Sequence, residues 1–256
     1  MSTARISDAR DGAADAPRLP FDERGGLVVL VDPGRTSPDD TFALAARASD
    51  AGITGLLIGD SLGRGGAITQ HVAAMRAAAP SVPIVQFPAS ADDLSADVDA
   101  VLFLVLLSGR NPRYLVEEQV RAVPFFERHP RVRAVSTAYL LIDGGRESAV
   151  EHVSRTTPLA AIDVARIAAH VKAGRLMGLH ATYLEAGSGA AQPVSARAIE
   201  AARIATDGPL LVGGGIDTPS AVLAAREAGA DYIVIGTVLE REPFAPIDAL
   251  ASAARA

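Results

Sequence analysis

The strongest constraint on the fold of this 256-residue chain is a regular alternation of short apolar runs with amphipathic helical segments. The runs are almost continuous in apolar residues, which is typical of parallel strands buried on both faces. Eight strand–helix units in a chain of this length predict a single closed (β/α)8 TIM barrel. An open doubly wound sheet is the alternative, but no G-x-G-x-x-G follows an early strand. The expected strands are residues 26–33, 53–60, 82–88, 99–107, 133–142, 179–187, 209–216 and 231–237.

The connection between the third and fourth runs is short. Only residues 89–98 separate them, whereas a crossover between parallel strands usually needs a dozen residues or more. We therefore predict that the third outer helix is missing or replaced. A gap of this kind, beside an apolar strand, would admit a long apolar ligand.

Composition excludes several kinds of chemistry and sets the domain limits. The chain has no cysteine, so thiolate nucleophiles, thiolate metal sites and disulfides are impossible. Its one lysine, Lys172, lies in a helical stretch of surface character, so we discount Schiff-base catalysis. Residues 1–24 read as a disordered N-terminal lead-in without a secretory signal, and residues 25–256 as the barrel domain.

Charge and hydropathy predict where the protein works. A net charge of −6 argues against nucleic-acid binding. No apolar run reaches the roughly 20 residues of a membrane span, so we expect a cytoplasmic protein with no transmembrane segment. An apolar substrate would still bring it into transient contact with a membrane surface.

Unusual residues follow the strands, where barrels of this type carry their chemistry. Gly213, Gly214 and Gly215 follow the seventh run, and Gly236 and Thr237 follow the eighth. Glycines let backbone N–H groups approach an anion, and the helix that follows adds a favourable dipole. Tight turns alone would also explain these glycines. Because they occur in pairs after the last two strands, we favour a phosphate site.

Acidic and phenolic residues lie at other strand ends. Tyr183 and Glu185 alternate with Leu184, so both point the same way and could orient or deprotonate a hydroxyl. Asp32 and Ser61 follow adjacent strands and could together hold one Mg²⁺, which prefers oxygen ligands. Each of these residues, taken alone, is equally well explained as a structural or turn residue. The aspartates between the third and fourth runs lack the spacing of a diphosphate motif, and we expect Asp92, Asp93 and Asp97 to be solvated loop acids.

Several segments, in this order along the chain, resemble the geranylgeranylglyceryl phosphate synthase family. The most specific is YLEAGSGA at residues 183–190, followed by LLVGGGI and AGADYIVIGT. DPGR, the GDS loop, FPAS, RNPRYL and AYLLIDGG also fall in the family's order. The resemblance covers roughly residues 27–241.

The resemblance implies a barrel whose third outer helix is replaced, opening a groove for a prenyl chain. It implies that a polyprenyl diphosphate donates its prenyl group to the hydroxyl of sn-glycerol 1-phosphate, with Mg²⁺ on Asp32 and Ser61. Glu185 would take the hydroxyl proton, Tyr183 would position the acceptor, and Arg35 would supply a cation. Family members are often dimers, which leaves a monomer and a homodimer both open. The residues implied in acceptor binding are Tyr183, Leu184, Glu185, Ala186, Gly187, Ser188, Gly189, Gly214, Gly215, Gly236 and Thr237.

Three departures from the family pattern leave the acceptor open. Arg35 stands where lysine is usual, Asp60 stands in a loop commonly written GGS, and Thr237 replaces an asparagine. We therefore keep 3-phosphoglycerate, the acceptor of a branch that makes phosphoglycolipid antibiotics, as an alternative. A phosphate-binding barrel isomerase or lyase, and a non-catalytic barrel, are the alternatives from other classes.

Overall fold

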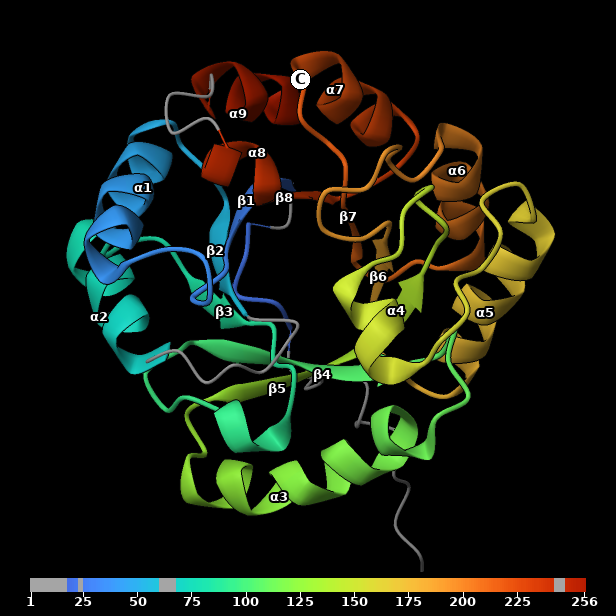
Figure 1. Ribbon diagram of the computed structural model, residues 1–256, viewed down its shortest axis with the longest axis horizontal. Coiled ribbons are helices and arrows are strands. Elements are labelled where there is room, and N and C mark those ends of the chain that lie inside the picture. Colours follow the sequence, from blue (N-terminus) through green and yellow to red (C-terminus); the bar gives the residue numbers. More distant parts are fainter. Residues whose placement is uncertain (1–17, 23–24, 60–67, 242–246) are drawn as a thin grey trace, which may run out of the picture.

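The computed structural model describes residues 18–22, 25–59, 68–241 and 247–256. Its strands pair in parallel and in sequence order, and the last pairs with the first to close a barrel. The predicted (β/α)8 barrel is confirmed, and Figure 1 shows it end-on inside a ring of helices. The strands are β1 (Gly26–Val31), β2 (Gly55–Ile58), β3 (Ile84–Gln86), β4 (Ala100–Leu106), β5 (Arg133–Leu141), β6 (Ala181–Glu185), β7 (Leu210–Gly213) and β8 (Tyr232–Ile235).

Several outer helices begin at side-chain caps. Ser195 before α6 and Thr218 before α7 each accept a hydrogen bond from the backbone N–H three residues later, which satisfies one free donor of the first turn. No helix among the described residues is long and apolar enough to cross a bilayer. The α-helices are α1 (Pro38–Asp50), α2 (Ile68–Ala78), α3 (Glu118–Arg128), α4 (Ala149–Ser154), α5 (Val164–Leu176), α6 (Ala196–Ala205), α7 (Pro219–Glu227), α8 (Thr237–Arg241) and α9 (Ile247–Arg255).

The strands bury both faces, as their apolar runs predict. One set of alternate side chains, including Leu57, Leu102 and Leu211, fills the barrel interior. The other set packs against the helices, where buried alanines such as Ala45 and Ala202 let the helices lie close to the strands. The abundance of alanine in the helical segments thus serves the outer layer of the core.

Residues 18–22 close one end of the barrel interior. Leu19 and Phe21 are buried in the interior cluster, and the Phe21 ring packs edge-on against Tyr232 at the start of β8, with centroids 5.3 Å apart. The Tyr232 hydroxyl donates a hydrogen bond to the carbonyl of Asp22 (3.1 Å). The packed unit therefore begins before residue 25, which corrects the predicted domain boundary. The physical reason is that Leu19 and Phe21 fill a buried site at the end of the barrel interior. Residues 1–17 and 23–24 of the predicted lead-in lie outside the described residues.

The short connection between β3 and β4 contains no outer α-helix. A single 3₁₀ turn, η1 (Ala91–Asp93), takes its place, as the length of this connection predicted. After β4 the chain forms a π-helical turn, η2 (Arg113–Glu117), which leads directly into α3. Figure 1 shows α3 running along the outside of β4 and β5. The ring of helices is therefore incomplete beside β4.

We predict that Phe21→Ala lowers the free energy of unfolding by about 3 kcal/mol, because it empties a buried aromatic site. Urea denaturation followed by circular dichroism measures this difference. Phe42→Ala on α1 is the matched control, since Phe42 is 47% exposed and its loss should cost less than about 1 kcal/mol. Equal losses in the two variants would contradict a role for residues 18–22 in closing the barrel.

Candidate active site

A cavity of about 430 Å³ opens at the carboxyl ends of the strands. Its volume lies within the range of about 300 to 1,000 Å³ that small-molecule sites occupy. The walls come from the ends of β1, β6, β7 and β8 and the loops that follow them. The predicted residues that line it are Asp32, Tyr183, Glu185, Ser188, Gly189, Gly214, Gly215, Gly236 and Thr237. The strand-end residues singled out from the sequence therefore meet at one place.

Glu185 is a buried carboxylate in the wall of this cavity. Its Oε1 accepts a hydrogen bond from the backbone N–H of Gly187 (2.7 Å). Burial raises the pKa of the Glu185 carboxyl, and the neighbouring Tyr183 hydroxyl and the N–H of Gly187 only partly oppose this shift. A carboxylate with a raised pKa is a stronger base than one in water, so this side chain suits proton transfer.

The Tyr183 hydroxyl lies close to Glu185 in the barrel interior. Burial, and then the neighbouring Glu185 charge, raise the pKa of Tyr183 well above its usual value, so the phenol stays protonated. The hydroxyl lies beside the Glu185 carboxylate, but no hydrogen bond of good geometry joins it to Glu185 or to any other described residue. An unsatisfied buried donor at the edge of a cavity is suited to a ligand that supplies the missing acceptor.

Glycines on β7 make room for this acid–phenol pair. Gly213 lies directly opposite Glu185 in the strand register, and a Cβ there would come within 2.6 Å of the Tyr183 hydroxyl. At Gly214 a Cβ would lie 2.6 Å from Glu185 Oε1, and φ is +84°, which L side chains rarely adopt. The triple glycine was predicted for phosphate binding; the structure adds that it accommodates Glu185 and Tyr183.

The opposite wall of the cavity presents backbone and a helix start. Gly215 and Gly236 line it together with Thr218 and Pro219 at the beginning of α7. The positive end of the α7 dipole therefore faces the cavity. This arrangement is suited to an anionic group such as phosphate.

Not every residue of the predicted acceptor site faces the cavity. Leu184 and Ala186 pack in the outer core between strands and helices, because side chains alternate along a strand. Their side chains therefore do not face the cavity, and their role in holding the acceptor stays a prediction. Gly187 does not line the cavity either; its N–H serves Glu185.

The predicted metal site is described only in part. Asp32 lines the cavity; its Oδ1 accepts the N–H of Gly34 (2.8 Å), and its Oδ2 lies 3.3 Å from Nε of Arg35. Arg35 is exposed and does not line the cavity. Ser61 and Asp60 lie outside the described residues. Within the described part of the chain, no three His, Cys, Asp or Glu side chains gather as a metal site.

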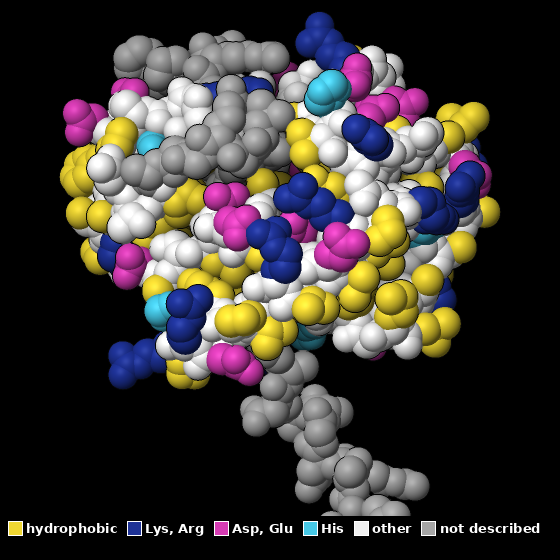
Figure 2. Space-filling model, turned by 60° about the horizontal axis from the view of Figure 1, so that its bottom comes forward, with side chains coloured by type: hydrophobic (Ala, Val, Ile, Leu, Met, Phe, Trp, Pro, Cys, Tyr) yellow, Lys and Arg dark blue, Asp and Glu magenta, His cyan; other side chains and the backbone are white. Residues whose placement is uncertain are grey.

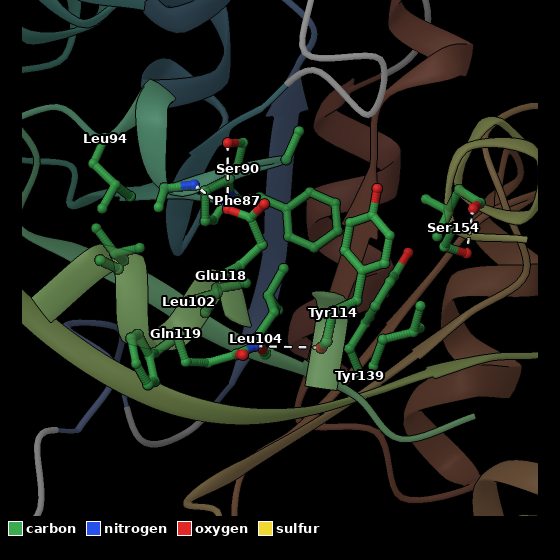
Figure 3. Close-up of a pocket in the computed structure, with 18 of the residues that line it drawn as sticks. Phe87, Ser90, Leu94, Leu102, Leu104, Tyr114, Glu118, Gln119, Tyr139 and Ser154 are labelled. Carbon is green, nitrogen blue, oxygen red and sulfur yellow. Dashed lines mark hydrogen bonds between the residues drawn. The ribbon is translucent and has the colours of Figure 1, made fainter. Parts of the chain in front are cut away.

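A second cavity, lined mostly by apolar residues, lies beside β4, and we call it the groove. Its volume is about 100 Å³, and its walls come from β4, from the segment around η1 and from the inner face of η2 and α3. Figure 3 shows Phe87 and Tyr139 toward the barrel centre and Leu94 toward the periphery. The gap predicted from the short third connection is thus an apolar pocket.

Three buried aromatic rings lie between the groove and the larger cavity. Phe87 and Tyr139 line the groove, whereas Tyr183 lines the larger cavity. The ring centroids are 5.5 Å apart for Phe87–Tyr139 and Phe87–Tyr183, and 5.6 Å apart for Tyr139–Tyr183. The sequence analysis did not single out Phe87 or Tyr139, although FPAS and AYLLIDGG contain them. Strand alternation could have identified both, because Tyr139 on β5 and Phe87 just after β3 point into the barrel interior.

The chain matches the PcrB family over residues 21–254. It is 37% identical over 216 residues to the geranylgeranylglyceryl phosphate synthase of Flavobacterium johnsoniae, which covers 84% of this chain and 88% of that relative. The protein of the same name from Aeropyrum pernix is 37% identical over 229 residues, covering 86% and 88%. A crystal structure of (S)-3-O-geranylgeranylglyceryl phosphate synthase from Thermoplasma acidophilum in complex with sn-glycerol-1-phosphate has a TM-score of 0.84 at 28% identity, covering 90% of this chain and 93% of that one.

These matches confirm the resemblance inferred from the strand-end motifs. The family match runs from the residue that closes the barrel interior almost to the end of α9, so it includes both cavities. The chain therefore belongs to the PcrB family and is related to the geranylgeranylglyceryl phosphate synthases.

Proposed function

We propose that this protein is a prenyltransferase that joins a polyprenyl group, from its diphosphate, to the hydroxyl of sn-glycerol 1-phosphate. The observation that carries the proposal is that two neighbouring cavities lie on either side of the aromatic rings beside Glu185: one cavity is suited to an anion and the other is apolar. The names of the relatives, and the glycerol phosphate bound in the Thermoplasma protein, support the same acceptor.

The acceptor occupies the larger cavity in this mechanism. The glycine turns after β7 and β8, with the start of α7, hold its phosphate. Glu185 orients the hydroxyl and takes its proton, while Tyr183 positions the glycerol. The hydroxyl oxygen forms the ether bond to the first prenyl carbon as the bond from that carbon to diphosphate breaks. Diphosphate leaves with the bonding electron pair, and the proton remains on Glu185.

The prenyl chain occupies the groove, with its reactive carbon at the aromatic rings. Positive charge develops on this allylic carbon as diphosphate departs, and aromatic faces stabilise cations. Phe87, Tyr139 and Tyr183 lie between the groove and the larger cavity, beside the place proposed for this carbon. The apolar walls of the groove also exclude water, which would otherwise capture the cation as an alcohol.

Asp32 fits the predicted role in magnesium binding. Mg²⁺ is commonly held by one or two carboxylates together with the phosphates of a substrate, and Asp32 places a carboxylate on the cavity wall. Ser61 remains the proposed second ligand. When bound, Mg²⁺ would neutralise negative charge on the leaving diphosphate.

An assay of several acceptors against several prenyl diphosphates tests the proposal. The purified protein is incubated with farnesyl, geranylgeranyl or heptaprenyl diphosphate and with sn-glycerol 1-phosphate, sn-glycerol 3-phosphate or 3-phosphoglycerate, with and without Mg²⁺. Mass spectrometry should detect an ether product with sn-glycerol 1-phosphate, together with free diphosphate. Product only with 3-phosphoglycerate would contradict the acceptor, and no product from any pair would contradict the reaction.

We predict that Glu185→Gln lowers kcat by about 100-fold to 10,000-fold, the usual contribution of a general base. The amide can still accept the N–H of Gly187, so circular dichroism should show an intact fold. Glu200→Gln on the exposed face of α6 is the matched control and should retain the wild-type rate. A kcat for Glu185→Gln within twofold of wild type would exclude proton transfer to this side chain.

The same substitution should change the dependence of stability on pH. Burial raises the pKa of Glu185 in the folded protein, so above that pKa the folded state carries a costly charge that the unfolded chain carries easily. Glu185→Gln should therefore be more stable than wild type at pH 7, and this gain should disappear below about pH 4, where the carboxyl is protonated in both states. Urea midpoints measured across this range test the sign, and a variant less stable at pH 7 would contradict it.

Gly214→Ala should both destabilise the protein and reduce transfer by at least about tenfold, because the new Cβ meets Glu185 Oε1. Gly178→Ala separates this clash from backbone strain: Gly178 has φ +81°, close to that of Gly214, but nothing lies within 4 Å of its Cβ position. Strain alone should cost the control about 1 kcal/mol and leave kcat unchanged. Equal kcat values for the two variants would show that the space around Glu185 does not matter.

A further inference from the structure

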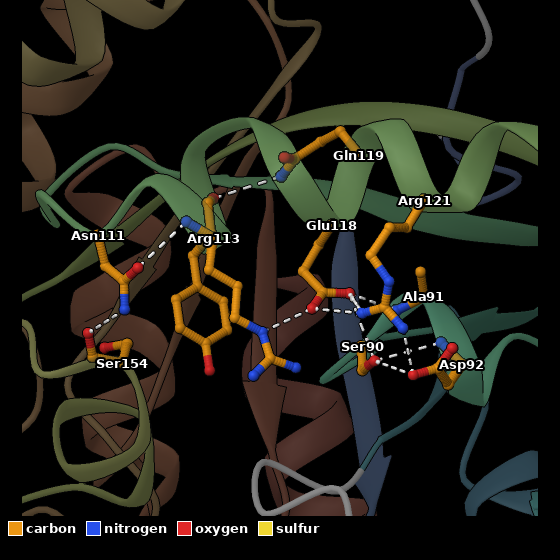
Figure 4. A network of polar contacts seen from close by, with 10 residues as sticks. Ser90, Ala91, Asp92, Asn111, Arg113, Glu118, Gln119, Arg121 and Ser154 are labelled. Carbon is orange, nitrogen blue, oxygen red and sulfur yellow. Dashed lines mark hydrogen bonds and ion pairs between the residues drawn. The ribbon is translucent and has the colours of Figure 1, made fainter.

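Glu118, in the first turn of α3, is a buried carboxylate that the proposed mechanism does not use. Its oxygens accept hydrogen bonds from the N–H of Ala91 (2.8 Å), the hydroxyl of Ser90 (3.3 Å) and Nε of Arg113 (2.7 Å). One terminal nitrogen of Arg121 also donates to both of them (2.9 and 3.0 Å). Figure 4 shows these donors converging on the carboxylate from several sides.

The donors come from opposite walls of the groove. Ser90 and Ala91 belong to the η1 segment after β3, whereas Arg113 and Arg121 belong to η2 and α3 after β4. Ser90, Ala91 and Glu118 all line the groove. The carboxylate therefore bridges the walls along one side, and we call this set of bonds the Glu118 clamp.

Arg121 extends the clamp to the next residue of η1. Its other terminal nitrogen binds the Asp92 carboxylate, which is 73% exposed, so Asp92 is a solvated loop acid as predicted and also forms a surface ion pair. On the face around α3, Figure 2 shows acidic and basic side chains adjacent to one another among hydrophobic ones. The outer side of the clamp is thus open to solvent, while its carboxylate is buried.

The η1 turn needs an external anchor. It has only three residues, too few for the regular hydrogen bonds of the outer helix that it replaces. Burial tends to raise the pKa of Glu118, but the Ala91 N–H and the two arginines outweigh it, so the pKa lies below its usual value and the carboxylate stays charged. The bonds from Ser90 and Ala91 restrict where η1 can lie, while the two arginines hold the Glu118 carboxylate in place.

On the opposite wall, Gln119 fastens α3 to the floor of the groove. Its side-chain amide donates to the carbonyl of Leu104 on β4 and to that of Tyr114 in η2 (3.3 Å). Glu118 and Gln119 are consecutive, so one turn of α3 is bound both to β4 and, across the groove, to η1. The separation of the two walls is therefore set at this turn.

We propose that Glu118 is a positioning residue that sets the width of the groove and thereby selects among prenyl chains. This inference rests on the proposed function, because it takes a prenyl chain as the occupant of the groove. The groove is about 100 Å³, smaller than most ligand sites, so the position of η1 limits what fits. Loosening the clamp weakens binding of the preferred chain and reduces the discrimination between chains.

Direct binding tests this inference without requiring catalysis. Thiolodiphosphate analogues of farnesyl, geranylgeranyl and heptaprenyl diphosphate, which resist ionisation, are titrated into wild type and Glu118→Gln, and sn-glycerol 1-phosphate is titrated separately. The Kd of the preferred prenyl analogue should rise about tenfold in the variant, as expected for losing a charge-assisted hydrogen bond. The ratio between the best and worst analogues should shrink, and the Kd of the acceptor should stay within about twofold.

Asp99→Asn is the matched control. Asp99 precedes β4, accepts the N–H of Ile84 (2.8 Å) and pairs with Arg76 (3.0 Å), but does not line the groove. Its variant should lose stability while keeping the wild-type ratio of Kd values. Arg121→Gln acts on the clamp from a half-exposed site if Glu118→Gln folds poorly, and its effect should not add to that of Glu118→Gln.

The outcomes separate this inference from the proposed function. Unchanged discrimination in both clamp variants, or equal changes in Asp99→Asn, would overturn the role of Glu118, as would a wild type that binds all analogues alike or none. A wild type that discriminates among analogues through Glu118 but forms no ether with any acceptor would support this inference and contradict the proposed reaction.

Discussion

The position of the candidate active site depends on one geometric constraint: in a closed parallel barrel, every second side chain of each strand must fit into a narrow interior. Phe87, Tyr139 and Tyr183 fill that interior near the carboxyl ends of the strands. Glu185 is the next inward position on β6 after Tyr183, so it lies where the packed interior gives way to the open cavity. The alternation that builds the core therefore also buries the carboxylate and raises its pKa.

Strand register turns this constraint into a site. Glu185 on β6 is paired with Gly213 on β7, so the buried carboxylate lies next to a residue with no side chain on the neighbouring strand. A larger residue there would compete with Tyr183 and Glu185 for the same space. The glycines at the end of β7 have no side chains to pack in the core. The space that larger residues would fill there is part of the cavity. Loss of stability and gain of a binding site have the same origin.

The sequence predicted features that depend on periodicity, and missed features that depend on contacts across the chain. Apolar runs predicted the barrel, and the length of residues 89–98 predicted the missing helix, because both follow from local spacing. Strand alternation could also have excluded Leu184 and Ala186 from the cavity, since it was already used to pair Tyr183 with Glu185. Across the groove, the Glu118 clamp joins residues 27 to 29 positions apart by side-chain geometry, which no spacing rule contains. The burial of Leu19 and Phe21 was missed for the same reason: their partners lie on β2 and β8.

The place of the missing third helix raises a problem of its own, because an apolar gap covered only by the short η1 turn would tend to close. Apolar side chains bridging η1 and α3 would satisfy the hydrophobic effect by filling the groove, since such contacts are non-directional. A charged bridge behaves differently: its hydrogen bonds have fixed lengths and directions, and its outer side is solvated. Glu118 and its arginines can therefore hold the walls at a defined separation along one side while the floor, at the partly buried Leu104, stays free to contact a ligand. An ionic clamp at the rim can therefore join the two walls and still leave the apolar groove open between them.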